Sequence, residues 1–429
     1  MLVSVASPAI PPRKLADFVY ARHGGVRIIA TPPNLMSTKK HAPKQTAANE
    51  VRLGIIGIGN MGSDHSKNLL AGKVPRIRLT AICDLDPARM TFDGVKHFTD
   101  SRELIRSGEV DAVLVATPHY YHTIIGIDAL EQGLHLLVEK PISVHKSDCE
   151  KLIAAHRDGQ VFAAMFNQRT DPFYQKIRSL IQSGELGEIR RMNWIITDWF
   201  RTCAYYASGG WRATWGGEGG GVLLNQCPHN LDLLQWMFGM PSSVRAFCRF
   251  GQYHDIEVED DVTAFLQFKN GATGIFVTTT GEAPGTNRLE IAAERGKLVY
   301  ERQRLTFTRN EVGMTEFSRT TDKAFATPPT WEIDIPVSGH GGQHIRILRN
   351  FAEAILDGAP LLAPAEEGIH SVELANAMLY STFTGKTVEI PLDGRAYERH
   401  LKKLIASSKV KKKAPARKAA ADDFAQSFK

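Results

Sequence analysis

Short hydrophobic runs rich in β-branched residues alternate with longer amphipathic stretches between residues 51 and 168. This alternation is typical of βαβ units, in which helices join buried parallel strands. It predicts five strands, at Val51–Gly57, Leu79–Cys83, Ala112–Ala116, Leu134–Val138 and Val161–Met165. It predicts helices between them at Met61–Leu70, Pro87–Lys96, Tyr121–Gln132 and Lys146–His156. We therefore expect an α/β domain with a doubly wound parallel sheet over residues 51–168.

The pattern changes after residue 168, where several strands follow one another without a helix between them. After a predicted helix at Phe173–Ser183, strands are predicted at Arg191–Thr197, Ser243–Phe250, Val262–Lys269, Thr273–Thr279, Asn287–Ala293 and Lys297–Tyr300. Further helices are predicted at Pro228–Phe238, His344–Leu356 and Glu367–Thr382. Consecutive strands favour antiparallel pairing. Residues 169–398 are therefore expected to form an α+β domain with a largely antiparallel open sheet.

The positive charge of the chain lies in its two ends. The formal net charge is +6, yet residues 51–399 hold 36 basic and 42 acidic side chains. We expect residues 1–50 to be a flexible extension and residues 399–429 to be a solvated basic tail rich in lysine and alanine. A contact of this tail with nucleic acid or a membrane is the alternative. The acidic body itself gives no indication of a nucleic-acid partner.

The composition is that of an ordinary globular protein, with 43% hydrophobic and 23% charged residues. The sequence contains no run of about 20 apolar residues of the kind that spans a membrane. Its five cysteines are scattered and form no CxxC pair. This pattern predicts neither a disulfide framework nor a metal site, and it favours a reducing compartment. We expect a soluble, cytoplasmic protein.

A glycine-rich turn joins the first predicted strand to the first helix. The GxGxxG spacing of dinucleotide-binding Rossmann domains is present in the run Gly57-Ile-Gly59-Asn60-Met61-Gly62. The first glycine permits a tight turn, the second lets the backbone approach a pyrophosphate, and the third lets the helix pack on the strand. Asp84 ends the second strand, where a carboxylate can bind the adenosine ribose and repel a 2′-phosphate. We therefore expect a site for NAD rather than NADP.

Two more motifs follow the third and fourth predicted strands, Ala116-Thr-Pro-His-Tyr-Tyr-His122 and Glu139-Lys-Pro141. Together with the glycine turn, they resemble the Gfo/Idh/MocA family of oxidoreductases (glucose–fructose oxidoreductase, inositol dehydrogenase, rhizopine catabolism). The resemblance extends from about Val51 to Leu392. It includes the segments Asn167–Arg169, Gly184–Gly187, Gly219–Asp232 and Gly385–Pro391. It implies a second domain that binds the substrate and pairs subunits into a homodimer or homotetramer.

The resemblance implies that Lys140 contacts both cofactor and substrate at the carboxyl ends of the strands, where its place after a strand also puts it. An ammonium group there can hydrogen-bond a substrate oxygen, and it can exchange a proton if burial lowers its pKa. An ordinary surface lysine is the alternative. By the same resemblance, Pro118 would lie against the nicotinamide ring and Thr117 near its ribose, with His122 and Glu139 also at the cofactor.

A second cluster surrounds His229, which matches the histidine that takes the hydroxyl proton in sugar and inositol dehydrogenases of the family. Imidazole suits this role because its pKa lies near neutrality. A structural histidine in the first turn of a helix is the alternative. Many family members have an aspartate four residues earlier, whereas this chain has Asn225. An amide can orient a substrate hydroxyl but cannot hold its proton, so we assign Asn225 to substrate binding and expect Asp232 to orient or cap.

Aromatic residues gather just before this cluster, with Trp194, Trp199, Trp211 and Trp215 within 22 residues. Aromatic rings beside hydrogen-bonding groups suit the faces of a sugar, whereas filling of the core is the alternative. We expect Trp194 to be core. No cluster of arginines indicates a phosphate, so the pattern favours an unphosphorylated sugar, cyclitol or glycoside. The other expected substrate-binding residues are Asn167, Arg169, Trp211, Arg212 and His344.

The sequence leaves three functions open. The first is an NAD-dependent oxidoreductase that acts on a secondary alcohol of a sugar, cyclitol or glycoside, with Lys140 and His229 as catalytic residues. The second is redox-neutral cleavage of a glycoside through transient oxidation, which Asn225 slightly favours. The third is a sugar- or NAD-sensing regulator. Retention of both Lys140 and His229 argues against it.

Overall fold

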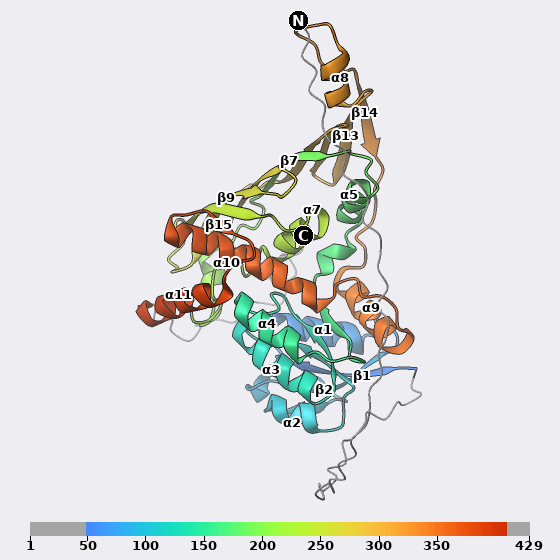
Figure 1. Ribbon diagram of the computed structural model, residues 1–429. Helices are drawn as coiled ribbons and strands as arrows, with labels where there is room; N and C mark the ends of the chain where they lie inside the picture. The colour runs from blue at the N-terminus through green and yellow to red at the C-terminus, as the bar shows by residue number, and fades with distance from the viewer. Residues whose placement is uncertain (1–48, 410–429) are drawn as a thin grey trace, which may run out of the picture. The chain divides into compact units, whose positions relative to one another are not determined.

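Two sheets organise the computed structural model, which describes residues 49–409 (Figure 1). The first sheet has six parallel strands in the order β3-β2-β1-β4-β5-β6. Its strands are β1 (Val51–Ile56), β2 (Ile77–Cys83), β3 (Lys96–Phe98), β4 (Ala112–Val115), β5 (His135–Val138) and β6 (Phe162–Ala164). Its helices are α1 (Asn60–Leu70), α2 (Ser101–Arg106), α3 (His119–Glu131) and α4 (Lys146–Ala155). The predicted doubly wound parallel sheet is confirmed.

One predicted helix of this domain is wrong. The segment predicted as the helix Pro87–Lys96 forms a single 3₁₀ turn at Pro87–Arg89, which Asp86 caps by accepting a hydrogen bond from the N–H of Ala88. The chain then turns at Gly94, whose φ of +77° favours glycine, and pairs as strand β3 with β2. The sheet therefore has six strands rather than five.

The second sheet has nine strands in the order β14-β13-β12-β11-β7-β10-β9-β8-β15. Every neighbouring pair is antiparallel except β7 and β10, which are parallel, so the sheet is mixed but largely antiparallel as predicted. The strands that correspond to predicted ones are β7 (Ile189–Ile196), β8 (Ser243–Phe250), β9 (Glu259–Gln267), β10 (Thr273–Thr279), β11 (Asn287–Ala293) and β12 (Gly296–Glu301). The sequence prediction missed β13 (Arg304–Asn310), β14 (Thr330–Ile335) and β15 (Val388–Glu389).

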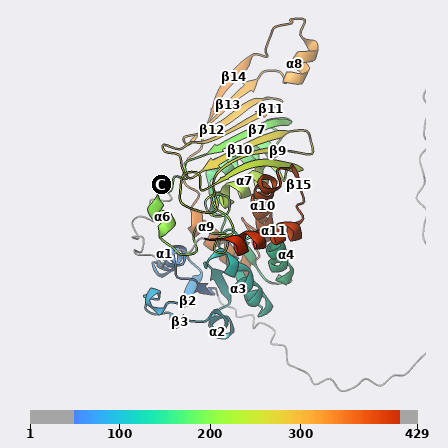
Figure 2. The ribbon, with the colours of Figure 1, turned by 90° about the vertical axis from the view of Figure 1, so that its left-hand side faces the viewer.

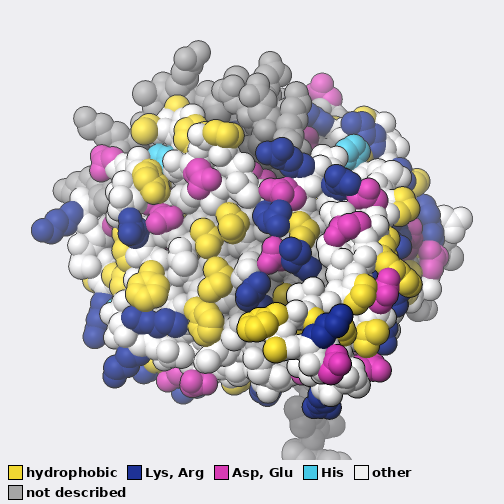
Figure 3. All heavy atoms as spheres, turned by 90° about the horizontal axis from the view of Figure 1, so that it is seen from above, with side chains coloured by type: hydrophobic (Ala, Val, Ile, Leu, Met, Phe, Trp, Pro, Cys, Tyr) yellow, Lys and Arg dark blue, Asp and Glu magenta, His cyan; other side chains and the backbone are white. Residues whose placement is uncertain are grey.

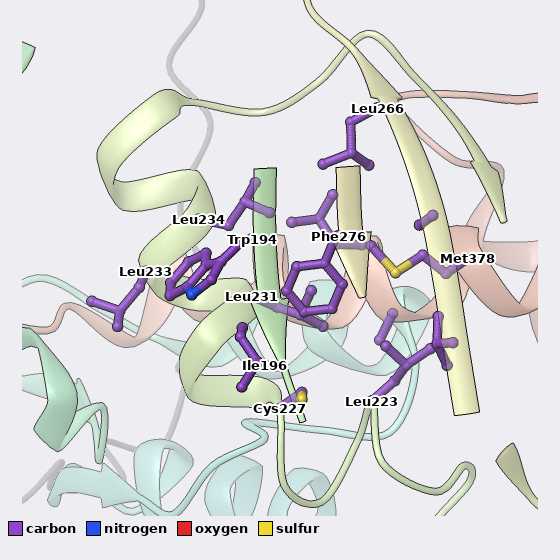
Figure 4. Close-up of a cluster of buried hydrophobic side chains, with 14 of the residues drawn as sticks. Trp194, Ile196, Leu223, Cys227, Leu231, Leu233, Leu234, Leu266, Phe276 and Met378 are labelled. Carbon is purple, nitrogen blue, oxygen red and sulfur yellow. The ribbon is translucent and has the colours of Figure 1, made fainter. Parts of the chain in front are cut away.

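Helices cover one face of this sheet, and α7 and α10 lie between it and the first domain (Figure 2). The helices of this half are α5 (Pro172–Gln182), α6 (Cys203–Ala207), α7 (Pro228–Phe238), α8 (Met314–Thr320), α9 (Gln343–Asp357), α10 (Gly368–Thr384) and α11 (Gly394–Ser407). Trp194 and Phe276 project from the sheet toward Leu231 of α7 and Met378 of α10 (Figure 4). Trp194 is completely buried, which confirms its expected place in the core.

Two helices depart from the predicted domain boundaries. Helix α9 was assigned to the second domain, but its residues Ile347, Leu348 and Phe351 pack into the core of the first. Helix α11 crosses the predicted start of the basic tail at residue 399, and its Leu401 packs into the core of the second domain. The predicted N-terminal extension up to residue 48 and the tail from residue 410 lie outside the described residues. Within residues 49–409, no helix is long and apolar enough to cross a membrane.

Helix α11 allows a direct test of its contribution to stability. Leu401 is 1% exposed, whereas Ile405, one turn later on the same helix, is 36% exposed. We expect Leu401→Ala to lower the free energy of unfolding by about 2–5 kcal/mol, because it leaves a cavity in the core. The matched Ile405→Ala variant should cost less than about 1 kcal/mol. Urea unfolding followed by circular dichroism measures both, and equal losses would show that α11 does not pack as described.

Candidate active site at the carboxyl ends of the first sheet

The glycine turn packs against the neighbouring strand end and the start of α1. Gly57 has a φ of +97°, and a Cβ atom there would lie 2.6 Å from the carbonyl oxygen of Ala116. A Cβ atom on Gly62 would lie 1.8 Å from the carbonyl oxygen of Gly57, so this position admits glycine alone without a shift of the backbone. Gly59 differs, because a Cβ atom there would meet nothing within 4 Å. The open space lies where α1 begins, with Asn60 and Met61 in its first turn.

Asp84 lies beside this turn. Its carboxylate accepts hydrogen bonds from the N–H of Ile58 at 2.8 Å and from the N–H of Asp86 at 2.9 Å. The side chain therefore ties the end of β2 to the middle of the glycine turn. This arrangement fits a dinucleotide. The open backbone at the helix N-terminus can bind the pyrophosphate, and the neighbouring carboxylate can bind the ribose hydroxyls.

His122 is used inside the protein rather than at the predicted cofactor surface. The ring is 1% exposed, and its two nitrogens lie 2.7 Å from the carbonyl oxygen of Thr117 and 2.8 Å from that of Pro141. It therefore joins the segment after β4 to the segment after β5. Burial lowers the pKa of His122 despite these hydrogen bonds. Pro118 stands just before α3, and the hydroxyl of Thr117 is buried without a partner in the described residues.

Glu139 forms a buried pair with His65 of α1. The carboxylate lies 2.8 Å from Nε2 of His65, and the N–H of Lys140 donates to its other oxygen at 3.2 Å. Burial alone would raise the pKa of Glu139, but the hydrogen bond from His65 and the nearby positive groups outweigh it and lower the pKa. Sequence reasoning missed His65, whose position one turn after Gly62 was the available signal.

The amine of Lys140 reaches across to the second domain. Its Nζ donates a hydrogen bond of 2.8 Å to the main-chain oxygen of Asn225. Burial lowers the pKa of Lys140; Arg201 and Arg212 lower it further, while Glu139 and Glu218 raise it. The lysine thus stands among charges of both signs at the carboxyl ends of the first sheet, rather than on the protein surface.

His229 occupies the first turn of α7, which begins at Pro228. The imidazole is 6% exposed, and its Nδ1 has no hydrogen-bond partner among residues 49–409. Burial lowers its pKa well below the usual value, and the positive charge of Lys140 lowers it further. The ring packs edge-on against Phe166, with the centroids 6.3 Å apart. Lys140 and His229 are thus electrostatic neighbours, and the histidine is neutral.

The predicted aromatic cluster lies against the side chain of Asn225. Tyr205 of α6 donates its hydroxyl hydrogen to Oδ1 of Asn225 at 3.2 Å and accepts a hydrogen bond from Nη1 of Arg212 at 2.8 Å. The guanidinium of Arg212 also lies over the rings of Tyr205 and Trp211, 4.6 and 4.9 Å from their centroids. Trp215, in contrast, is buried in the core of the second domain.

Three other predicted substrate-binding residues are placed differently from one another. Arg169 is 1% exposed and donates to Asp232 at 2.6 and 2.7 Å, so it is a buried structural cation instead of a substrate contact. Asn167 donates to Gln343 at 2.7 Å, and its Oδ1 has no partner in the described structure. His344 of α9 lies 5.6 Å from the ring of His65, and burial lowers its pKa to about 4. His344 therefore belongs to the group around Glu139.

Nowhere in residues 49–409 do three His, Cys, Asp or Glu side chains form a group that could hold a metal ion.

Comparison with known proteins identifies the family. Residues 51–166 match the model of the oxidoreductase family with an NAD-binding Rossmann fold, and residues 174–299 match the model of the GFO/IDH/MocA C-terminal domain. The chain therefore belongs to the Gfo/Idh/MocA family of oxidoreductases, and its first domain is an NAD-binding Rossmann domain.

Curated relatives include inositol 2-dehydrogenase 2 of Paenarthrobacter aurescens, which is 25% identical over 79% of this chain and 97% of that protein. Levoglucosan dehydrogenase of Pseudarthrobacter phenanthrenivorans is 23% identical over 80% of this chain and 98% of that protein. Among solved structures, the WlbA dehydrogenase of Bordetella pertussis in complex with NADH and UDP-GlcNAcA has a TM-score of 0.68 at 24% identity, covering 80% of this chain and 100% of that one. The fold is therefore that of this family of dehydrogenases.

The glycine turn yields a paired prediction that separates packing from NAD binding. Gly62→Ala should lower the free energy of unfolding by about 3 kcal/mol without any ligand, because its Cβ collides with the backbone. Gly59→Ala should leave stability unchanged but weaken NAD binding at least about tenfold, because the added methyl group occupies the approach to the pyrophosphate. Thermal unfolding and calorimetric titration with NAD measure the two effects. Unchanged NAD affinity in Gly59→Ala would contradict the location of the site.

Proposed function

We propose that the protein transfers a hydride between NAD and a secondary alcohol of a sugar, cyclitol or glycoside. One observation carries this proposal: the half-buried Lys140 after β5 bonds the main chain of Asn225, and its charge acts on the buried His229 four residues later at the start of α7. An amine that can hold the substrate oxygen and an imidazole that can take its proton are the groups that oxidation of an alcohol needs. The relatives named inositol 2-dehydrogenase and levoglucosan dehydrogenase support a cyclitol or sugar as substrate.

In this proposal NAD, when bound, supplies the hydride acceptor, and the chain supplies position and proton transfer. The turn from Gly57 to Gly62 and Asp84 hold the dinucleotide. Lys140 donates a hydrogen bond to the substrate oxygen and stabilises the negative charge that develops there. His229 accepts the hydroxyl proton, because its lowered pKa keeps the imidazole neutral. The proton then passes from His229 to solvent.

The aromatic cluster is the proposed binding surface for the sugar ring. Trp211 and Tyr205 offer apolar faces for C–H groups, and the guanidinium of Arg212 and the amide of Asn225 offer hydrogen bonds to hydroxyls. Arg169 has no place in this surface because Asp232 and Glu367 engage its guanidinium. The expected specificity is therefore for an uncharged ring with several hydroxyl groups.

A sugar panel with NAD tests the proposed chemistry. Lys140→Ala and His229→Ala should each lower kcat/KM more than about tenfold, because each removes a group that acts on the reacting hydroxyl. The exposed Lys151 and His97 give matched controls, and Lys151→Ala and His97→Ala should keep wild-type rates. Activity of wild type should fall at low pH only below the usual range of histidine, since burial lowers the pKa of His229.

Two results would contradict the proposal. Unchanged rates in both active-site variants would remove Lys140 and His229 from the mechanism. Cleaved glycoside without accumulation of NADH would instead support the redox-neutral alternative, which absorbance of NADH and product analysis distinguish.

We also propose that the open face of the second sheet pairs subunits. Its outward side chains include Phe247, Phe265 and Ile195, which are 61, 39 and 37% exposed. Strand pairing brings them into adjacent rows, because Phe265 lies opposite Ile275 and Ile195 opposite Val277. Figure 3, which faces this side of the molecule, shows hydrophobic side chains among charged ones of both signs. Such a mixed apolar and charged face suits a self-complementary interface between two copies of the chain.

The pairing is tested by light scattering coupled to size exclusion. Wild type should elute as a dimer or tetramer, and Phe247→Glu should dissociate it, because burial of a carboxylate against the partner's apolar side chains is costly. Ile124 of α3 is as exposed as Phe247 but lies on the first domain, so Ile124→Glu serves as the matched control and should not change the mass. A monomeric wild-type protein would contradict the proposal.

A further inference from the structure

A buried carboxylate, that of Glu218, contacts Asn225, the residue whose main-chain oxygen accepts a hydrogen bond from Lys140. Glu218 lies in the glycine-rich loop before α7 and is 2% exposed. One of its oxygens accepts a hydrogen bond from the N–H of Ala213 at 2.6 Å, and the other accepts one from Nδ2 of Asn225. Nη1 of Arg212 lies 3.9 Å from the second oxygen. Glu218 is not among the residues that sequence analysis assigned to the site.

Asn225 links Glu218 to Lys140, because it forms a hydrogen bond to each of them. The main-chain oxygen of Asn225 accepts the hydrogen bond from Nζ of Lys140. Its side chain is held on both sides, by Glu218 through Nδ2 and by Tyr205 through Oδ1. Because both ends of the side-chain amide of Asn225 are held, the residue is fixed in place. Its main-chain oxygen, which orients the lysine, is therefore fixed as well. A carboxylate in a buried site also interacts more strongly with an ammonium than it would in water.

We propose that Glu218 is a positioning residue for Lys140: through Asn225 it orients the amine, and it supplies the negative charge that an amide at position 225 lacks. The proposal rests on the function proposed above, because it concerns the same lysine. Many family members have an aspartate four residues before the histidine, where this chain has Asn225. The proposal is that Glu218 supplies the missing carboxylate from another position of the same loop.

Two neighbouring carboxylates show what a merely structural role looks like. Glu259 accepts hydrogen bonds from the N–H groups of Gly221 and Leu223, and Glu257 accepts one from the N–H of Trp215. Both therefore anchor the backbone of the same loop. Within residues 49–409, neither Glu257 nor Glu259 forms a hydrogen bond to Asn225, and neither ranks among the main charges acting on Lys140. Glu218, in contrast, accepts a hydrogen bond from Asn225 and is one of those charges. Loop anchoring alone therefore does not account for Glu218.

The test exchanges the two functional groups. In Glu218→Gln/Asn225→Asp, the oxygen of Gln at 218 can accept from Ala213, and its NH₂ group can donate to Asp at 225. The swap keeps the hydrogen bonds and the net charge but moves the carboxylate from residue 218 to residue 225. Glu218→Gln alone removes the charge, and Glu257→Gln is the matched control that removes a loop-anchoring carboxylate.

Two measurements follow Lys140 in these variants: the alkaline limb of the pH profile of kcat/KM, and the pKa from NMR of ¹⁵N-lysine-labelled protein. The NMR signal is assigned by its loss in Lys140→Met. Glu139, Arg201 and Arg212 also act on the charge of Lys140, and the charge of Lys140 in turn acts on His229 and His119. None of these five residues is changed in any of the variants.

The proposal predicts that Glu218→Gln shifts the pKa of Lys140 and the alkaline limb to lower pH, because the carboxylate that favoured the ammonium is gone. It should also lower kcat/KM about tenfold or more through misplacement of the amine. The swapped variant should return the pKa of Lys140 and the alkaline limb to their wild-type positions or above them, and Glu257→Gln should move neither.

A wild-type alkaline limb and Lys140 pKa in Glu218→Gln, or no return in the swapped variant, would overturn the proposal. If Glu218→Gln does not fold, Glu218→Asp decides, because its shortened carboxylate loses the contact with Asn225 and the alkaline limb must then shift to lower pH. An absence of turnover by wild type on every sugar would refute the proposed function, whereas the NMR measurement would still decide the role of Glu218.

Discussion

The proposed active site depends on a half-buried lysine amine that lies where the two domains meet. A buried ammonium is costly unless it is hydrogen-bonded and faces opposite charge. Lys140 meets both conditions by crossing from the end of β5 to the main-chain oxygen of Asn225 in the second domain. That contact joins the loop before α7 to the carboxyl edge of the parallel sheet. The pair of Glu139 with His65 supports it from one side, and Glu218 with Asn225 supports it from the other.

The same burial separates the protonation states of the two reacting groups. Desolvation lowers the pKa of both Lys140 and His229, and the positive charge of Lys140 lowers the pKa of His229 further. The carboxylates Glu139 and Glu218 favour the protonated form of Lys140, whereas burial and the charge of Lys140 favour the neutral form of His229. A donor and an acceptor of protons can thus stand side by side at neutral pH, which is the arrangement that reversible oxidation of an alcohol requires.

Hydrophobic periodicity predicted the architecture well because both sheets are buried on at least one face. It failed where short-range chemistry overrides it, as at Pro87–Lys96, where the Asp86 cap and Gly94 produce a turn and a short strand. The glycine turn, Lys140 and His229 were predictable because each is local to a motif. Arg169 was misassigned because its carboxylate partners, Asp232 and Glu367, are distant in the sequence. His65 and Glu218 were missed because their roles depend on tertiary contacts that no spacing records.

Transfer of a deuterium label tests the central claim most directly. A sugar or cyclitol substrate that carries deuterium on the oxidised carbon should give NADH with the label at C4 of the nicotinamide ring, and turnover should show a primary isotope effect. Because the proposed mechanism transfers the hydride directly to the coenzyme, no label should be lost to water. Product formed with the deuterium released to solvent, or with no label on the nicotinamide, would contradict this account of the site.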